Sequence, residues 1–121
     1  MDLIKTFTFD AAHKLTRLPK GHKCANLHGH TFQVDIHISG PVDSTQGWLI
    51  DFADIKQICL PVIDQLDHHY LNDIEGMENP TSENIASWIW DRVEKKLPKL
   101  IKVVVHESRD SAAAYRGEQE E

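Results

Sequence analysis

The chain has 121 residues, of which 40% are hydrophobic, and this is the size and composition of one domain with an ordinary core. We therefore expect a single domain over residues 1–121, with a frayed acidic tail at about 117–121. The formal net charge of −6 argues against a protein that binds nucleic acid or an anionic membrane surface. The two cysteines form no CxxC pair, the N-terminus has no apolar signal-peptide core, and no apolar run approaches the roughly 20 residues that span a bilayer, so we expect a cytoplasmic protein.

Two segments in the first third of the chain alternate between apolar and polar residues, as β-strands do. The alternation is loose over residues 3–13, and His13 continues the apolar face of that segment. It is stricter over residues 28–38, where His28 and His30 begin the apolar row. We expect a strand over each segment, followed by a turn region rich in Gly, Pro and Ser.

The period changes to that of a helix at Asp51. Apolar residues follow the three-and-four spacing of a helix face over residues 52–66, with Asp51 as a plausible N-cap. Pro61 falls inside this pattern and removes a backbone donor, so we expect a kink or a break into two shorter pieces. A second helix is expected from Thr81, its N-cap, with an apolar stripe that extends to Leu97.

The end of the chain returns to the alternation of strands. One face of a long strand holds Ile101, Val103, Val105 and Glu107, and residues 112–115 are compatible with a short fourth strand. The order of elements indicates the α+β class, with an antiparallel sheet and two helices packed on one face.

The segment between Asp10 and Asp35 is locally cationic although the protein is acidic. It contains no carboxylate, and its charged and ionisable residues are Lys14, Arg17, Lys20, Lys23 and four histidines. A solvated loop would explain the charge, but the histidines favour a segment that attracts an anionic substrate.

His28 and His30 are candidate metal ligands. A period of two places both imidazoles on one face of a strand, roughly 6.5 to 7 Å apart at the backbone. Histidine nitrogen suits zinc, and a catalytic zinc generally has three protein ligands and an open position. We select His13 as the third ligand because it ends a strand whose apolar face it shares. The alternative is that these histidines are polar residues that hydrogen-bond at strand ends.

Cys24 is a candidate base or nucleophile. It lies in the cationic loop, where nearby positive charge or a metal favours the thiolate. It is alternatively a fourth zinc ligand, which would close the site and make it structural, or a small buried side chain. Cys59 belongs to the apolar stripe of the first helix, so we assign it to the core.

Two carboxylates are also candidates for a functional role. Asp67 precedes His68, and an Asp that holds and polarises a His is a common arrangement for proton transfer; a capping Asp beside a surface His is the alternative. Glu107 ends a buried row, and a buried carboxylate is costly unless it is paired. It either forms a salt bridge, for example with Arg109 or Arg116, or binds a ligand that presents two parallel N–H donors.

At these residues the sequence resembles the 6-pyruvoyltetrahydropterin synthase family, and most closely its bacterial, carboxy-forming branch. The resemblance covers nearly the whole chain. Its motifs are Phe9–His13, Gly21–Cys24, Leu27–His30, Asp51–Phe52, Leu66–Asn72, Asn79–Glu83 and His106–Glu107. Each piece is weak alone, but the ordered set is highly specific; His106 stands where the family commonly has Lys or a similar residue.

The resemblance implies a zinc-dependent lyase that acts on 7,8-dihydroneopterin triphosphate. It implies Zn²⁺ on His13, His28 and His30, and Cys24 as the catalytic base. It also implies that Asp67 and His68 handle protons and that Glu107 anchors the pterin ring. The implied fold is the tunnelling fold, in which trimers close their sheets into a barrel, two trimers stack as a hexamer, and active sites lie between subunits.

Two outcomes of the chemistry and one other class of protein stay open. The bacterial branch forms 6-carboxy-5,6,7,8-tetrahydropterin, acetaldehyde and triphosphate on the route to queuosine, whereas the runner-up eliminates triphosphate to form a 6-pyruvoyl product. A closed zinc site or a pterin-binding site without turnover would instead make the chain a non-catalytic module.

Overall fold

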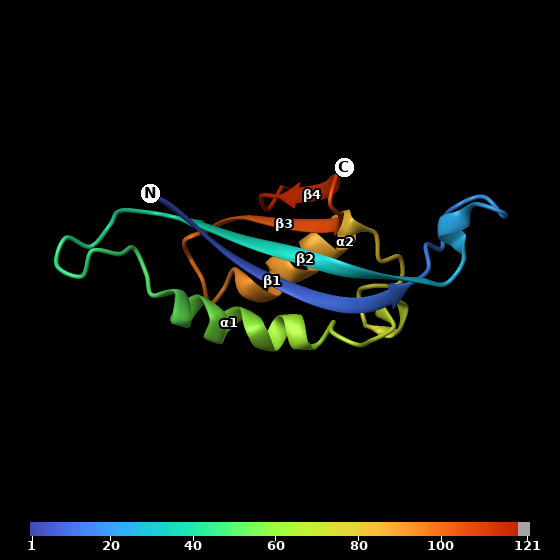
Figure 1. Cartoon of the computed structure of the whole chain (residues 1–121), viewed down its shortest axis with the longest axis horizontal. Coiled ribbons are helices and arrows are strands. Elements are labelled where there is room, and N and C mark those ends of the chain that lie inside the picture. The colour runs from blue at the N-terminus through green and yellow to red at the C-terminus, as the bar shows by residue number, and fades with distance from the viewer. Residues whose placement is uncertain (119–121) are drawn as a thin grey trace.

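The computed structural model describes residues 1–118 and places a sheet against two helices (Figure 1). The elements follow in the order β1 (Asp2–His13), η1 (Lys23–Ala25), β2 (His28–Ser39), α1 (Phe52–Asp64), η2 (Leu71–Asp73), α2 (Ser82–Val93), β3 (Leu100–Ser108) and β4 (Ser111–Tyr115). The strands pair in the antiparallel order β1-β2-β3-β4. The expected α+β class is therefore confirmed.

The sheet is organised around the long hairpin of β1 and β2. Its register runs without interruption from Asp2 opposite Ser39 to His13 opposite His28. Because side chains alternate along a strand, Phe9 and Phe32 point to the same face, where their rings stack with centroids 5.0 Å apart. The hydrophobic core fills the space between this face and the two helices.

The helices begin where their caps predict, and α1 is not divided by its proline. The Asp51 side chain accepts the Ala53 N–H at 2.9 Å, and the Thr81 side chain accepts from Asn84. Pro61 lies inside α1, which continues to Asp64, so of the expected kink or break the break was wrong. Pro61 is exposed, and so is Gln57, whose carbonyl loses its helical donor, so water can replace the missing bond.

The expected face of the last long strand needs one correction. Val103 and Val105 are fully buried, but Ile101 is 39% exposed and Leu100 is buried in its place. The register of β2 and β3 shifts between His37 and Ile38, so that Ile38 lies opposite Leu100. One extra residue of β3 is accommodated there, as in a β-bulge, and this changes which side chain faces the core.

The chain end is packed as far as it is described. Tyr115 donates a hydrogen bond to the Glu118 carbonyl, and a Cβ at Gly117 would lie 2.7 Å from the Trp90 ring. The rest of the tail expected at 117–121 lies outside the described residues. Among residues 1–118, no helix combines the length and apolarity needed to cross a membrane.

Candidate active site

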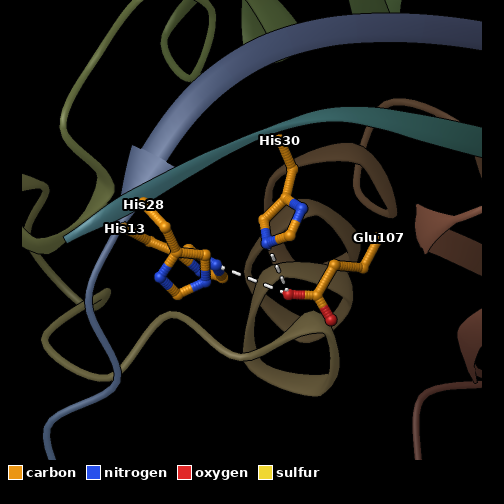
Figure 2. A group of neighbouring side chains, drawn as sticks. All are labelled: His13, His28, His30 and Glu107. Atoms are coloured by element: carbon orange, nitrogen blue, oxygen red, sulfur yellow. Dashed lines mark ion pairs between the residues drawn. The ribbon is translucent and has the colours of Figure 1, made fainter. Parts of the chain in front are cut away.

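Three histidines converge at one end of the β1–β2 hairpin (Figure 2). His13 lies directly opposite His28 in the register, and His30 is two residues further along the same strand, so all three rings project from one face. The ring centroids are 4.5 Å apart for His13 and His28, 5.1 Å for His13 and His30, and 4.9 Å for His28 and His30. The hairpin register thus arranges three imidazoles at nearly equal separations.

Backbone carbonyls orient two of these rings. The Nδ1 of His13 lies 2.7 Å from the Pro80 carbonyl, and the Nδ1 of His28 lies 2.7 Å from the Asn26 carbonyl. A carbonyl only accepts hydrogen bonds, so each Nδ1 must carry the hydrogen, and in the neutral ring Nε2 keeps its lone pair. Carbonyls that orient histidines in this way are typical neighbours of metal ligands.

The Glu107 carboxylate faces two of the three histidines. Its Oε1 lies 3.4 Å from the His13 Nε2 and 3.1 Å from the His30 Nε2, while both nitrogens are buried and lack a hydrogen-bond partner. In the neutral His13 ring, whose Nδ1 carries the hydrogen, Nε2 and the Glu107 oxygen are both acceptors, and they repel unless a cation lies between them. One ligand atom from each of these two histidines, from His28 and from Glu107 fits within 4.8 Å of the others.

These distances fit a small cation with nitrogen and oxygen ligands. Ligand atoms of a tetrahedral zinc lie about 3.4 Å apart when the bonds are about 2.1 Å long. The two contacts of Glu107 already have that length. Burial lowers the pKa of His13, against a rise caused by its bond to Pro80, and the charges of His28 and His30 lower it further. The neutral imidazole that a metal requires is therefore favoured.

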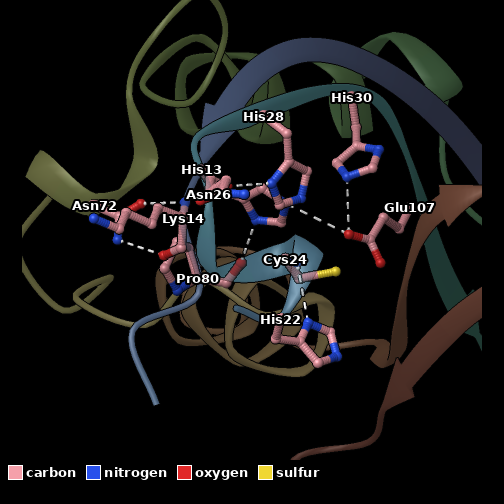
Figure 3. Close-up of polar contacts among 10 residues, drawn as sticks. All are labelled: His13, Lys14, His22, Cys24, Asn26, His28, His30, Asn72, Pro80 and Glu107. Carbon is pink, nitrogen blue, oxygen red and sulfur yellow. Dashed lines mark hydrogen bonds and ion pairs between the residues drawn. The ribbon is translucent and has the colours of Figure 1, made fainter. Parts of the chain in front are cut away.

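Cys24 lies beside the histidine group (Figure 3). Among the described residues, it is not one of the side chains whose ligand atoms gather there. It lies in η1, which His22 caps: the Cys24 N–H donates to the His22 Nδ1 at 3.1 Å. Cys24, Lys23, His28, His30 and Glu107 line one cavity of about 420 Å³, together with Ser108 and Ser111. A thiol at this place can reach a molecule bound beside the histidines.

The structure places Asp67 and His68 beside each other, and His68 lines a cavity that Cys24 does not line. Asp67 Oδ1 lies 3.0 Å from His68 Nδ1, and His68 adopts a positive φ of 59°. The backbone hydrogen bond from Asp10 lowers the pKa of Asp67, and the His68 contact adds to that effect. His68 and His30 both line a cavity of about 650 Å³ at the edge of β1, and His30 also lines the Cys24 cavity.

Several neighbouring residues lie in the sequence motifs but were assigned no role there. The Asn72 side chain accepts from the Lys14 N–H at 2.9 Å and donates to the Lys14 carbonyl at 2.7 Å, next to His13. The Ser82 hydroxyl is buried without a hydrogen-bond partner. His106 pairs with Asp35 at 2.8 Å instead of standing free on the surface. Only the Asn-rich motifs around Asn72 and Ser82 could have drawn attention to these residues.

The comparisons with known proteins agree with this geometry. The model of the family described as 6-pyruvoyl tetrahydropterin synthase matches residues 2–118. A 6-carboxy-5,6,7,8-tetrahydropterin synthase from Synechocystis is 40% identical, over 93% of this chain and 91% of that protein. A dihydroneopterin monophosphate aldolase from Pyrococcus furiosus is also 40% identical, over 84% of this chain and 82% of the relative.

The fold supports the same relationship. The structure of 6-pyruvoyl tetrahydropterin synthase from Caenorhabditis elegans superposes with a TM-score of 0.90 at 28% identity, covering 98% of this chain and 96% of that one. The residues that match the family model include all four strands and every residue of the histidine group. The chain belongs to the 6-pyruvoyl tetrahydropterin synthase family.

Proposed function

We propose that this pterin lyase depends on zinc and converts 7,8-dihydroneopterin triphosphate to 6-carboxy-5,6,7,8-tetrahydropterin, acetaldehyde and triphosphate. The observation that carries the proposal is the group of three histidines, with unpartnered Nε2 atoms on His13 and His30, beside the free thiol of Cys24. The likeness to the Synechocystis relative, which bears the name of the carboxy-forming enzyme, supports this reaction over elimination alone. On the same likeness we propose a place in queuosine synthesis and in the cytoplasm.

His13, His28 and His30 would hold the zinc, which when bound supplies a Lewis acid for the hydroxyl groups of the substrate side chain. Cys24 would remove a proton from that side chain, since its thiol borders the same cavity as His28 and His30. Asp67 would orient and polarise His68, which exchanges the second proton with the pterin. Cleavage of the bond between the first and second side-chain carbons, with loss of triphosphate and uptake of one water, would give the carboxyl carbon and the two carbons of acetaldehyde; the oxidation of the first carbon is matched by reduction of the dihydropterin ring to the tetrahydro level.

We further propose that Glu107 anchors the pterin ring. Glu107 borders a second cavity of about 470 Å³, formed by the start of α2 and by β4, in addition to the Cys24 cavity. The buried, unpartnered hydroxyl of Ser82 belongs to a residue that lines that second cavity. A heterocycle with adjacent N–H groups would satisfy both the carboxylate and the hydroxyl, which supports binding there.

We propose that the chain works as a homo-oligomer, a dimer of trimers whose active sites lie between subunits. His68 lines a cavity other than that of Cys24, so a neighbouring subunit is the natural source of the Asp67–His68 pair that meets a given substrate. β1 and β4 are the two edge strands of the sheet, and pairing of these edges between subunits would close a barrel.

Product analysis tests the proposed reaction. Purified protein loaded with zinc is incubated with 7,8-dihydroneopterin triphosphate, acetaldehyde is coupled to an alcohol dehydrogenase, and the pterin and triphosphate are quantified by mass spectrometry. Acetaldehyde released in step with triphosphate, with a 6-carboxy pterin, supports the proposal. Triphosphate with a 6-pyruvoyl product and no acetaldehyde refutes carbon–carbon cleavage.

Two further measurements separate the remaining alternatives. Dihydroneopterin monophosphate is offered as a second substrate because of the aldolase named among the relatives, and its preferred cleavage would overturn the triphosphate specificity. A chelator then distinguishes a catalytic zinc from a structural one. If metal removal unfolds the protein instead of only silencing it, the chain is a zinc-stabilised module.

A further inference from the structure

Asp10 holds the Asp67–His68 pair through its backbone. The Asp10 N–H donates to Asp67 Oδ1 at 3.0 Å, and the Asp10 carbonyl accepts the His68 N–H at 2.6 Å. The next contact along the same edge is the bond from the Ala12 N–H to the His69 carbonyl at 3.2 Å. The loop that carries the pair is therefore docked on the edge of β1, and Asp10 bonds both members of the pair.

The Asp10 side chain also faces the pair. Phe9 and Ala11 are buried under the helices, so alternation along β1 places the Asp10 side chain on the uncovered face of the sheet. The Thr31 hydroxyl, opposite it in the register, donates to its carboxylate and fixes its position. A carboxylate oxygen of Asp10, one of Asp67 and a ring nitrogen of His68 all lie within 4.8 Å of one another.

We propose that the Asp10 carboxylate is a positioning residue for proton transfer by His68, acting through its charge to favour the imidazolium that donates a proton. This rests on the proposed function, in which His68 exchanges a proton with the pterin. Asp67 contacts the His68 ring only at Nδ1. The second carboxylate increases the negative potential around the ring.

The surroundings of His68 offer few competing charges. The titratable residues that line its cavity are Asp10 from β1, His30 from β2, and His69 and Tyr70 from its own loop. Asp67 adds the direct contact at 3.0 Å. The His68 side chain is 78% exposed, so water weakens each of these interactions.

The test uses Asp10→Asn in the full chain, because this change removes the charge and keeps both backbone bonds. Asp2→Asn is the matched control, since it removes the same charge from the same face of β1, eight residues away, about 26 Å along the strand. Ring signals of His68 are followed by NMR against pH and identified by their loss in His68→Gln. The rate of pterin turnover is measured over the same pH range.

In Asp10→Asn, the titration of the His68 ring and the His68-controlled limb of the rate profile should both move to lower pH, because loss of the nearby negative charge disfavours the imidazolium. Asp2→Asn and the conservative Asp10→Glu should leave both near their original positions. An unmoved ring titration, or a rate loss at every pH without displacement of the profile, overturns the proposal. If the unmodified protein does not turn over the pterin, the proposed function fails, while the ring titration still decides the effect of the charge.

Discussion

Asn72 should stabilise the metal site although it binds no metal itself. Its side-chain amide makes two hydrogen bonds with the backbone of Lys14, at 2.9 and 2.7 Å, and a longer one of 3.3 Å to the Glu78 carbonyl. Asn72→Ala removes the partners of both Lys14 backbone groups. At about 0.5–1.5 kcal/mol for each of the two short bonds, the free energy of unfolding should fall by about 1–3 kcal/mol.

The same change should weaken metal binding because Lys14 follows His13 in the chain. Residues that position a ligand typically change metal affinity by about 10- to 100-fold, and we expect about tenfold here since Asn72 acts through the backbone beside the ligand. Urea denaturation of the metal-free protein measures the first effect, and competition with a chromophoric zinc chelator measures the second. Asn72→Asp keeps the acceptor for the Lys14 N–H but sets a carboxylate oxygen against the Lys14 and Glu78 carbonyls, so it should not recover the lost stability.

The reasoning is refuted if Asn72→Ala unfolds at the same urea concentration as the unmodified protein and keeps its zinc affinity. Gln57→Ala is the matched control, since it removes an exposed amide from the outer face of α1 and should change neither quantity. A loss of stability without any loss of zinc affinity would show that the hydrogen bonds hold the loop but do not position His13.

Cys24→Ala should retain zinc and bind the pterin while its turnover falls about 10²- to 10⁴-fold, the usual contribution of a positioned acid or base. His28→Ala should instead lose both zinc and activity, so metal analysis beside kinetics separates a base from a ligand, and loss of zinc from Cys24→Ala would make the thiol a ligand. Burial acts to raise the pKa of Asp35, but hydrogen bonds from Thr6, His106 and Gln33 outweigh it and hold the pKa below 3.8. The carboxylate therefore contributes stability above pH 3.8, and this contribution is lost as the pH falls through the pKa of the folded state. The urea midpoint of Asp35→Asn should therefore decrease less on acidification than the midpoint of the unmodified protein.

The sequence was sufficient for features that depend on local periodicity. The strict alternation from His28 predicted β2 and the shared face of His28 and His30, and the caps Asp51 and Thr81 predicted where the helices start. Cys59 was assigned to the core, where its burial raises the pKa of the thiol to about 11. These properties need only the neighbours within a few residues, which a single sequence displays.

Features that depend on pairing between distant segments could not be predicted in this way. The face of Ile101 was wrong because the register shift lies between β2 and β3, more than 60 residues apart in the chain. The hydrogen bonds of Asn72 with Lys14 span 58 residues, and that of Asp10 with Asp67 spans 57. The roles of Cys24, Glu107 and the Asp67–His68 pair came from the family resemblance and stay predictions until the variants are measured.

The placement of the ligand group has a consequence for the order in which the site forms during synthesis. His13, His28 and His30 all belong to the hairpin at the start of the chain, and closing it requires only the loop of residues 14–27. Glu107 is made last of the group, after both helices. Because domains emerge from the ribosome N-terminus first, the nascent chain presents three imidazoles before it has the carboxylate that closes the group. Early metal capture would restrict the hairpin before its apolar face is covered by α1 and α2.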